Sequence, residues 1–236
     1  MLAILGGVSW GISGVCSQYL FIKYNVSADW LTAVRMLLSG IFLLGLALQK
    51  EGMRTFKIWK EQKDVKWLIA FSLAGLLLCQ YTFFSAIKYS NTATATVLQS
   101  LNVVLMAVVV AVWNKKRMSK MQIAAIILAV SGTYLIATKG NLTSMDLSVK
   151  GLVFGILAAA GVVTYTLLSR PIVASWGNLI VTGWGMLIGG SVFFVLIRAW
   201  IFPENLDFPA WAIIAVIVII GTAVGFSVFL SVSSNE

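Results

Sequence analysis

The 236-residue chain contains no histidine, two cysteines and only eight acidic residues. Without histidine it lacks the commonest metal ligand and the commonest general base of enzymes. Cys16 and Cys79 both fall inside long apolar runs, so we expect neither a disulfide framework nor a cysteine metal site. No acidic residue lies in the middle of an apolar run. These absences argue against an enzyme, a metal or a bound cofactor, and against an exporter that exchanges protons on a membrane carboxylate.

The composition is that of a membrane protein. Apolar residues make up 60% of the chain and charged residues 11%, and the mean hydropathy is +0.96. A soluble domain could not cover its own surface with this composition. Basic residues outnumber acidic ones by 17 to eight, but nearly all of them lie in loops between apolar runs. This distribution is typical of a chain that keeps its basic loops in the cytoplasm, and it argues against nucleic-acid binding. We therefore expect an all-α, polytopic protein whose main partner is the lipid bilayer.

Residues 91–138 predict a transmembrane helical hairpin that orients the rest of the chain. Its apolar runs, 93–113 and 121–138, flank a short loop at 114–120 that holds four Lys and Arg. The first run has 21 residues without a charge. At about 1.5 Å per residue it matches the roughly 30 Å of a bilayer's hydrocarbon core. In lipid every backbone group must pair internally, so the run has to be helical. The basic loop places this end of the hairpin in the cytoplasm.

The same criteria predict eight transmembrane helices. Their bounds are 2–22, 31–48, 67–87, 93–113, 121–138, 151–169, 179–197 and 210–232. With a cytoplasmic N-terminus, eleven Lys and Arg lie in cytoplasmic loops, five lie outside, and Arg35 lies within a span. No basic n-region or small-residue cleavage site marks the first span as a removable signal peptide. Five tryptophans at span ends predict an interfacial aromatic belt: Trp30, Trp67, Trp113, Trp200 and Trp211.

The chain also repeats itself at a constant spacing. At an offset of 150 residues Gly11 aligns with Gly161, Leu37 with Leu187 and Gly40 with Gly190, and the third and eighth spans align at an offset of 146. Because each repeat has an odd number of spans, the second copy enters the membrane inverted. Inverted repeats are a transporter architecture, with the substrate site between the copies near the midplane. The predicted units are residues 1–138 and residues 151–236.

Several motifs resemble the EamA-like branch of the drug/metabolite transporter superfamily. They are Gly7-Val8-Ser9-Trp10-Gly11, Arg35, Ala86-Ile87-Lys88-Tyr89-Ser90 before an Ala/Thr-rich fourth span, and Gly132-Thr133-Tyr134-Leu135. The resemblance covers essentially the whole chain. It implies a ten-helix, five-plus-five carrier of small metabolites, which we expect in the plasma membrane of a bacterium. The bias of Lys and Arg between the loops places its N-terminus in the cytoplasm. Asn102 stands where the family often has Pro, and Asn114-Lys115 where it often has Gly-Glu.

The repeat spacing also predicts what the chain lacks. At the offset of 146, Glu236 aligns with Ser90, so the sequence stops before the counterpart of the 91–138 hairpin. We expect an incomplete chain that lacks the last two of ten helices, is loosely packed or compensated by self-association such as a homodimer, and does not transport by itself. The functional hypothesis is a secondary transporter that moves a small metabolite, such as an amino acid or related solute, by alternating access. The alternative is a truncated, non-transporting membrane protein or scaffold.

Polar side chains inside the spans supply the candidate substrate site. Arg35 could hold an anion or carboxylate through its forked guanidinium, or reach the outer interface or backbone carbonyls instead. Gln80 and Tyr81 of the third span lie near the midplane. On the fourth span a polar stripe at helical spacing predicts a wet cavity or, equally, hydrogen bonds that hold helices together. The stripe consists of Thr92, Thr96, Gln99, Asn102 and Met106.

Two tryptophans and four glycine pairs complete the candidates. Trp10 and Trp184 lie within spans, where they could line the same cavity or pack in the core. The glycine pairs predict close helix packing; they are Gly7/Gly11, Gly151/Gly155, Gly185/Gly189 and Gly221/Gly225. The predicted substrate-binding residues are Trp10, Arg35, Gln80, Tyr81, Thr96, Gln99, Asn102 and Trp184.

Single cysteines test the predicted orientation. In a variant without Cys16 and Cys79, we expect Lys116→Cys to be protected from a membrane-impermeant maleimide in intact cells and Ser144→Cys to react, because the basic loop 114–120 should be cytoplasmic. Permeabilised cells are the control, in which both positions should react. Labelling of position 116 but not of position 144 in intact cells would reverse the topology.

Overall fold

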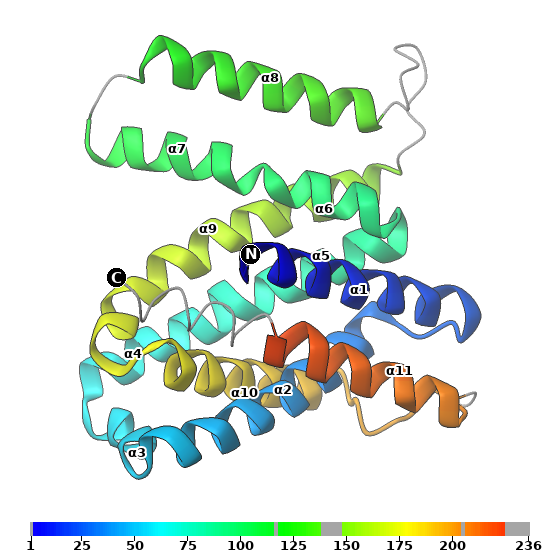
Figure 1. Ribbon diagram of the computed structural model, residues 1–236, viewed down its shortest axis with the longest axis vertical. Helices are drawn as coiled ribbons and strands as arrows, with labels where there is room; N and C mark the ends of the chain where they lie inside the picture. Colours follow the sequence, from blue (N-terminus) through cyan, green and yellow to red (C-terminus); the bar gives the residue numbers. More distant parts are fainter. Residues whose placement is uncertain (1, 116–117, 138–147, 204–205, 225–236) are drawn as a thin grey trace.

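The computed structural model describes residues 2–115, 118–137, 148–203 and 206–224, and these residues are mostly helical (Figure 1). In Figure 1 the α7–α8 hairpin lies at the top, α9, α5 and α1 cross the middle, and α10, α2 and α11 lie below them. In chain order the elements are α1 (Leu2–Lys23), α2 (Ala28–Glu51), α3 (Arg54–Lys57), η1 (Ile58–Lys60), α4 (Gln62–Ala70), η2 (Phe71–Leu77), α5 (Leu78–Tyr89), α6 (Thr92–Ser100), α7 (Asn102–Trp113), α8 (Lys120–Ala137), α9 (Val149–Trp176), α10 (Asn178–Leu196), α11 (Phe208–Val218) and η3 (Ile219–Val224).

The predicted all-α, polytopic architecture is confirmed. Each predicted span coincides with a helix or with consecutive helical segments, and the eighth is described as far as Val224. Among the described residues, five helices are long and apolar enough to cross a membrane: Ala28–Glu51, Gln62–Tyr89, Thr92–Trp113, Val149–Trp176 and Asn178–Leu196. Lys120–Leu135 and Phe208–Gly221 form shorter apolar helices.

Side-chain caps fix where several of these helices begin. Ser27 accepts a hydrogen bond from the Trp30 amide at 3.1 Å, and Asn91 accepts one from the Thr94 amide at 2.8 Å. Ser148 and Asp207 cap α9 and α11 in the same way. A cap pairs an amide that the first helical turn leaves without a partner. The loop residues therefore set the ends of α2, α6, α9 and α11.

Helices α2 and α10 pack through a reciprocal pair of glycines. A Cβ added at Gly40 would lie 2.5 Å from the Leu187 backbone nitrogen, and one added at Gly190 would lie 2.6 Å from the Leu37 nitrogen. At the 150-residue offset Gly40 aligns with Gly190 and Leu37 with Leu187, so each of the two contacts is the counterpart of the other. Only glycine lets the two backbones approach this closely.

The third and eighth spans both contain a π-helical segment where a plain α-helix was expected. The segments are Phe71–Leu77 and Ile219–Val224, and the 146-residue offset moves the first to 217–223, which overlaps the second. Each holds a glycine at a close helix approach. A Cβ at Gly75 would lie 2.8 Å from the Tyr165 Cα, and one at Gly221 would lie 2.8 Å from the Ser13 Oγ. Such π-helical insertions are often found at functional sites.

Some of the other glycines that were predicted to pack closely do so, and Gly11 does not. A Cβ at Gly155 would collide with the Leu98 side chain, and one at Gly189 would lie 2.9 Å from the Ser72 carbonyl oxygen. Around Gly11 no described atom lies within 4 Å of an added Cβ. The surroundings of Gly7 and Gly225 fall outside the described residues. Close packing therefore accounts for the glycines of α9 and α10 but not for Gly11.

The fourth span is interrupted at Leu101, between α6 and α7. The Leu101 amide donates to the Leu98 carbonyl at 3.2 Å, a bond of the tighter i→i−3 type. The Asn102 carboxamide donates to the Gln99 carbonyl at 2.7 Å. Beyond the break, α7 has no buried residue, and α8 packs beside α6 and α7. The hairpin that was predicted as two plain helices therefore has a break in its first helix and stands to one side of the bundle (Figure 1).

Trp30 is a correction to the predicted aromatic belt. Trp67, Trp113, Trp200 and Trp211 are exposed, as a belt requires, but Trp30 is only 4% exposed. Its indole nitrogen donates to the Ala199 carbonyl at 3.0 Å, and its ring meets Phe202 and Trp211 edge-on. It ties the start of α2 to the segment between α10 and α11.

The glycine contact between α2 and α10 gives a stability prediction. We expect Gly190→Ala to lower the free energy of unfolding by about 1–3 kcal/mol, the usual cost of overpacking a tight interface. The added methyl would press on the Leu37 backbone, which cannot turn away. Denaturant unfolding in detergent micelles measures the change.

The matched control is Gly45→Ala, since Gly45 is also helical but has no atom within 4 Å of an added Cβ. It should leave stability unchanged or raise it by up to about 1 kcal/mol through helix propensity. Equal unfolding of the two variants would show that the α2–α10 approach is not tight.

Candidate functional site

Arg35 lies in the interior of the bundle, on the inner face of α2. Arg35 is buried, with 6% of its surface exposed. Its Nη1 donates a hydrogen bond to the Gln80 Oε1 of α5 at 3.0 Å. The guanidinium carbon also lies 4.9 Å from the centre of the Phe84 ring, one turn further along α5. A cation over an aromatic face is attracted by the ring quadrupole. The Arg35 side chain therefore does not reach toward the outer interface, because its guanidinium lies inside the helix bundle.

Two more elements close the site around Arg35. Ser13 of α1 is 4% exposed, and Gly221 lies in the π-helical segment η3. A Cβ at Gly221 would lie 3.2 Å from the Arg35 Nη2 and 2.8 Å from the Ser13 Oγ. Glycine at this position thus leaves room for the guanidinium. The site brings together α1, α2, α5 and η3, which come from both predicted repeats.

Arg35 has no carboxylate partner in the part of the chain that the structure describes. The ion pair found there joins Arg54 to Glu51, at the far end of α2. A guanidinium carries five N–H donors in a fixed fork that matches a carboxylate or phosphate. Gln80 supplies a neutral acceptor for one of them. A buried cation with spare donors and no acidic partner is suited to bind a small anion.

A second polar group extends from this site toward the hairpin. The Gln99 carboxamide of α6 donates to the Cys79 thiol at 3.8 Å, and Cys79 precedes Gln80 on α5. Asn102 reaches Gln99 through its backbone carbonyl. Of the predicted set, Arg35 and Gln80 are therefore in direct contact, Gln99 contacts the residue before Gln80, and Asn102 contacts only the backbone of Gln99.

The structure places the other predicted site residues elsewhere. Tyr81 packs edge-on against Phe154 and Phe193, toward α9 and α10. Trp10 is 58% exposed, and Thr96 is exposed with its hydroxyl donating to the Thr92 carbonyl at 2.8 Å.

Trp184 lies at the opposite end of the bundle from Trp30. Its indole nitrogen donates to the Thr55 carbonyl at 2.9 Å. Its ring meets Phe56 and Trp59 edge-on, at centroid distances of 5.8 and 5.0 Å. Trp184 thus holds the segment after α2 against α10, apart from the Arg35 region.

Sequence reasoning missed Ser13, Phe84 and Gly221. For Ser13 a signal was available, because Ser9, Ser13 and Ser17 recur every four residues in an apolar helix and all three are buried. Residues spaced by four share a helix face. Gly221 was singled out only as one of the packing glycines, and Phe84, the second of two adjacent phenylalanines in the third span, gave no such signal.

Comparison with known proteins agrees with this architecture. A family model described as the EamA-like transporter family matches residues 1–138. An "Uncharacterized inner membrane transporter YicL" of Salmonella typhimurium is 34% identical over 231 residues, covering 96% of this chain and 75% of that protein. An "Uncharacterized transporter YyaM" of Bacillus subtilis is 25% identical over 213 residues, covering 87% and 67% respectively.

A solved crystal structure shares the fold at a TM-score of 0.60 and 16% identity, covering 95% of this chain and 76% of the other. The apolar helices and the enclosed polar site, taken with these relatives, define a multi-pass membrane transporter. The chain belongs to the EamA-like transporter family, as the matched family model and the YicL relative show.

The contact between Arg35 and Gln80 gives a prediction at the site. Gln80→Leu should lower the free energy of unfolding by about 1.5–3 kcal/mol, the usual worth of a hydrogen bond to a charged group. Gln80→Glu should not lower it, because a carboxylate at this position would pair with the guanidinium. Thermal unfolding in detergent compares the variants.

Thr96→Val is the control, since Thr96 is exposed and bonds only within its own helix in the described structure. It should unfold like the parent protein. If Gln80→Leu also unfolds like the parent, Gln80 does not hold Arg35 in place.

Proposed function

We propose that this transporter moves a small metabolite bearing a carboxylate, such as an amino acid or related solute, by alternating access, and that Arg35 binds the carboxylate. The observation that supports this most is the buried guanidinium of Arg35, whose one hydrogen-bond acceptor in the described structure is the neutral Gln80. Taking a cation out of water is costly, and membrane proteins keep such groups mainly for function. The proposal involves no chemical change in the solute.

The neighbouring polar groups suit a solute larger than a simple anion. Gln80 contacts Arg35 from α5, Gln99 of α6 contacts the neighbouring Cys79, and Ser13 of α1 lies beside Gly221 next to the guanidinium. Amide and hydroxyl groups can accept and donate, so they can bind an amino or hydroxyl group next to the carboxylate. Phe84 supplies an apolar wall beside the guanidinium.

The packing of α2 on α10 supports alternating access. Reciprocal contacts, Gly40 on Leu187 and Gly190 on Leu37, are what two copies related by a two-fold axis in the membrane would make. The π-helical segments at Gly75 and Gly221 fall at matching positions in the two copies and next to α9 and α1. We infer two inverted units, 1–138 and 151–236, that move against each other around the Arg35 region.

The orientation and location are also proposals. The basic loops 50–66 and 114–120 favour a cytoplasmic N-terminus. The relative from Salmonella typhimurium carries "inner membrane" in its name, and we propose the same membrane for this chain. A homodimer is a further proposal, and the largely exposed faces of α7 and α8 leave room for such a contact.

Uptake into proteoliposomes tests the function. In a form of the protein extended by two further helices, because the 236-residue chain is not expected to transport by itself, we expect accumulation of an amino acid but not of the amine that corresponds to it without its carboxylate. Arg35→Gln should weaken binding of the amino acid by roughly tenfold or more, since a charge-assisted hydrogen bond is worth about 1.5–3 kcal/mol. Gln80→Glu should abolish uptake without unfolding the protein, because its own carboxylate would occupy the guanidinium.

The two variants distinguish the outcomes. Amino-acid uptake by Arg35→Gln at the parental rate would remove Arg35 from the substrate site. Binding of the amino acid by the parent protein without accumulation would favour the alternative of a non-transporting membrane protein.

A further inference from the structure

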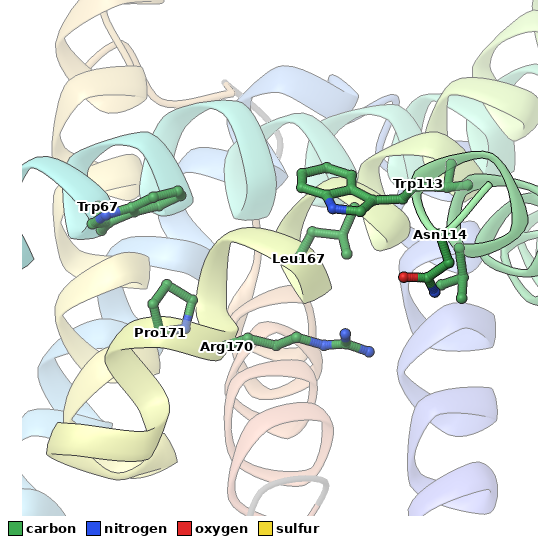
Figure 2. Close-up of a pocket in the computed structure, with 8 residues that line it drawn as sticks. Trp67, Trp113, Asn114, Leu167, Arg170 and Pro171 are labelled. Atoms are coloured by element: carbon green, nitrogen blue, oxygen red, sulfur yellow. The ribbon is translucent and has the colours of Figure 1, made fainter.

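We propose that an anionic phospholipid binds with its phosphate between α4, α7 and α9, in a pocket separate from the Arg35 region. The pocket has a volume of about 380 Å³. Figure 2 shows that the side chains around it come from the second half of α4, the end of α7 and the last part of α9. The proposal does not depend on the transported solute, because Arg35 and Gln80 take no part in this pocket.

The lining of the pocket combines polar and apolar side chains. Arg170 extends from α9 toward Asn114 at the end of α7 (Figure 2). Val110 and Leu167 contribute apolar side chains to the same lining. A soluble anion could use the polar groups but would leave the apolar side chains in contact with water. A phospholipid satisfies both, with its phosphate on the arginine and the first methylenes of a chain on the valine and leucine.

The depth of the pocket matches that of a lipid headgroup. Trp67 begins the third predicted span, Trp113 ends the fourth, and Arg170 directly follows the sixth, so three span ends meet at one face of the membrane. Tryptophan rings at span ends sit at headgroup level. The apolar residue Val110 lies one turn of α7 deeper than Asn114. A bound lipid would therefore keep the orientation that it has in the bilayer.

The charge around the pocket favours an anionic lipid. Arg170 is exposed, and no carboxylate lies within ion-pair distance of it in the described parts of the chain. Lys66 and Lys115 adjoin the lining residues Trp67 and Asn114 in the sequence. The nearby acid Asp64 accepts a hydrogen bond from the Trp176 indole at 2.7 Å. Basic pockets between transmembrane helices on the cytoplasmic side commonly bind anionic headgroups.

Pro171 adds a feature that suits a headgroup with hydroxyls. It lies inside α9 and has no amide hydrogen, so the Leu167 carbonyl loses the donor that a continuous helix would supply. Leu167 is one of the lining residues, so we propose that its carbonyl accepts a hydrogen bond from the headgroup. A phosphatidylglycerol headgroup carries both the negative phosphate and hydroxyl donors. Phosphatidylcholine has no hydroxyl and neutralises its phosphate with a trimethylammonium group.

Fluorescence quenching by brominated lipids tests the site, because Trp67 and Trp113 line it. In the full chain in detergent, we expect brominated phosphatidylglycerol to quench at a roughly tenfold lower concentration than brominated phosphatidylcholine, the difference of about one charge-assisted contact. Arg170→Gln should remove most of that preference. Lys60 is exposed and lies in the basic loop 50–66, outside the pocket. Lys60→Gln removes one positive charge there and should keep the preference for phosphatidylglycerol.

Each further result counts for or against the proposal. Val110→Phe should fill the groove without adding a tryptophan to the signal and should weaken quenching by both lipids, with circular dichroism confirming that the helices persist. Unchanged quenching in this variant would place the lipid elsewhere and overturn the proposal. An equal loss of preference in Arg170→Gln and Lys60→Gln would show a diffuse surface effect, and equal affinity for the two lipids would show an apolar groove without headgroup selection. Displacement of the brominated lipid by inorganic phosphate alone would instead assign the pocket to a soluble anion. Each of these last three results would overturn the proposal.

Discussion

A guanidinium inside a membrane-spanning bundle has to find its partners within the protein, because the bilayer core offers neither water nor counter-ions. Arg35 meets this constraint with side chains from several helices: Gln80 accepts its hydrogen bond, and Phe84 lies against its face. The glycine at position 221 leaves the space that the Nη2 group needs next to Ser13. Arg35 thus contacts or adjoins side chains of α1, α5 and η3 from its place on α2, and none of these partners is acidic.

Glycines bring the helices close enough for this arrangement. Gly40 and Gly190 join α2 to α10, and Gly161 joins α9 to α5, where an added Cβ would lie 2.7 Å from the Cys79 Cα. Without a hydrophobic drive between helices in lipid, close packing and hydrogen bonds have to hold the bundle together. The contact at Cys79 is next to Gln80, so the packing of α9 on α5 also sets the position of the acceptor for Arg35.

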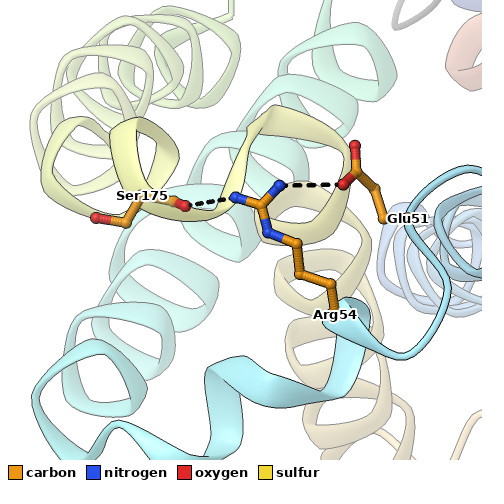
Figure 3. Close-up of polar contacts among 3 residues, drawn as sticks. All are labelled: Glu51, Arg54 and Ser175. Carbon is orange, nitrogen blue, oxygen red and sulfur yellow. Dashed lines mark hydrogen bonds and ion pairs between the residues drawn. The ribbon is translucent and has the colours of Figure 1, made fainter.

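The basic segment that follows α2 is tied to the bundle by polar contacts. Figure 3 shows Arg54 between Glu51 and Ser175: its Nη1 donates to the glutamate at 3.1 Å and its Nη2 to the Ser175 carbonyl at 3.0 Å. Trp184 holds Thr55 from α10, as described above. An exposed ion pair contributes little to stability by itself. Together, these bonds link the end of α2 to the end of α9 and the first part of α10. They lie at the same membrane face as the proposed phospholipid pocket.

The sequence by itself determined the membrane class and the spans. A run such as 93–113 can pair its backbone groups in hydrocarbon only as a helix, so its structure follows from local sequence. The family could be recognised from motifs spread along the chain, and the family match confirms it. Tertiary structure alone decided that Arg35 meets Gln80, 45 residues away, that Trp30 is buried, and that Trp184 faces Thr55 and not the polar region. Those outcomes depend on the rotation and depth of each helix. An almost uniformly apolar span has no strong periodicity to reveal its inward face, so only the packing of one helix on another could set it.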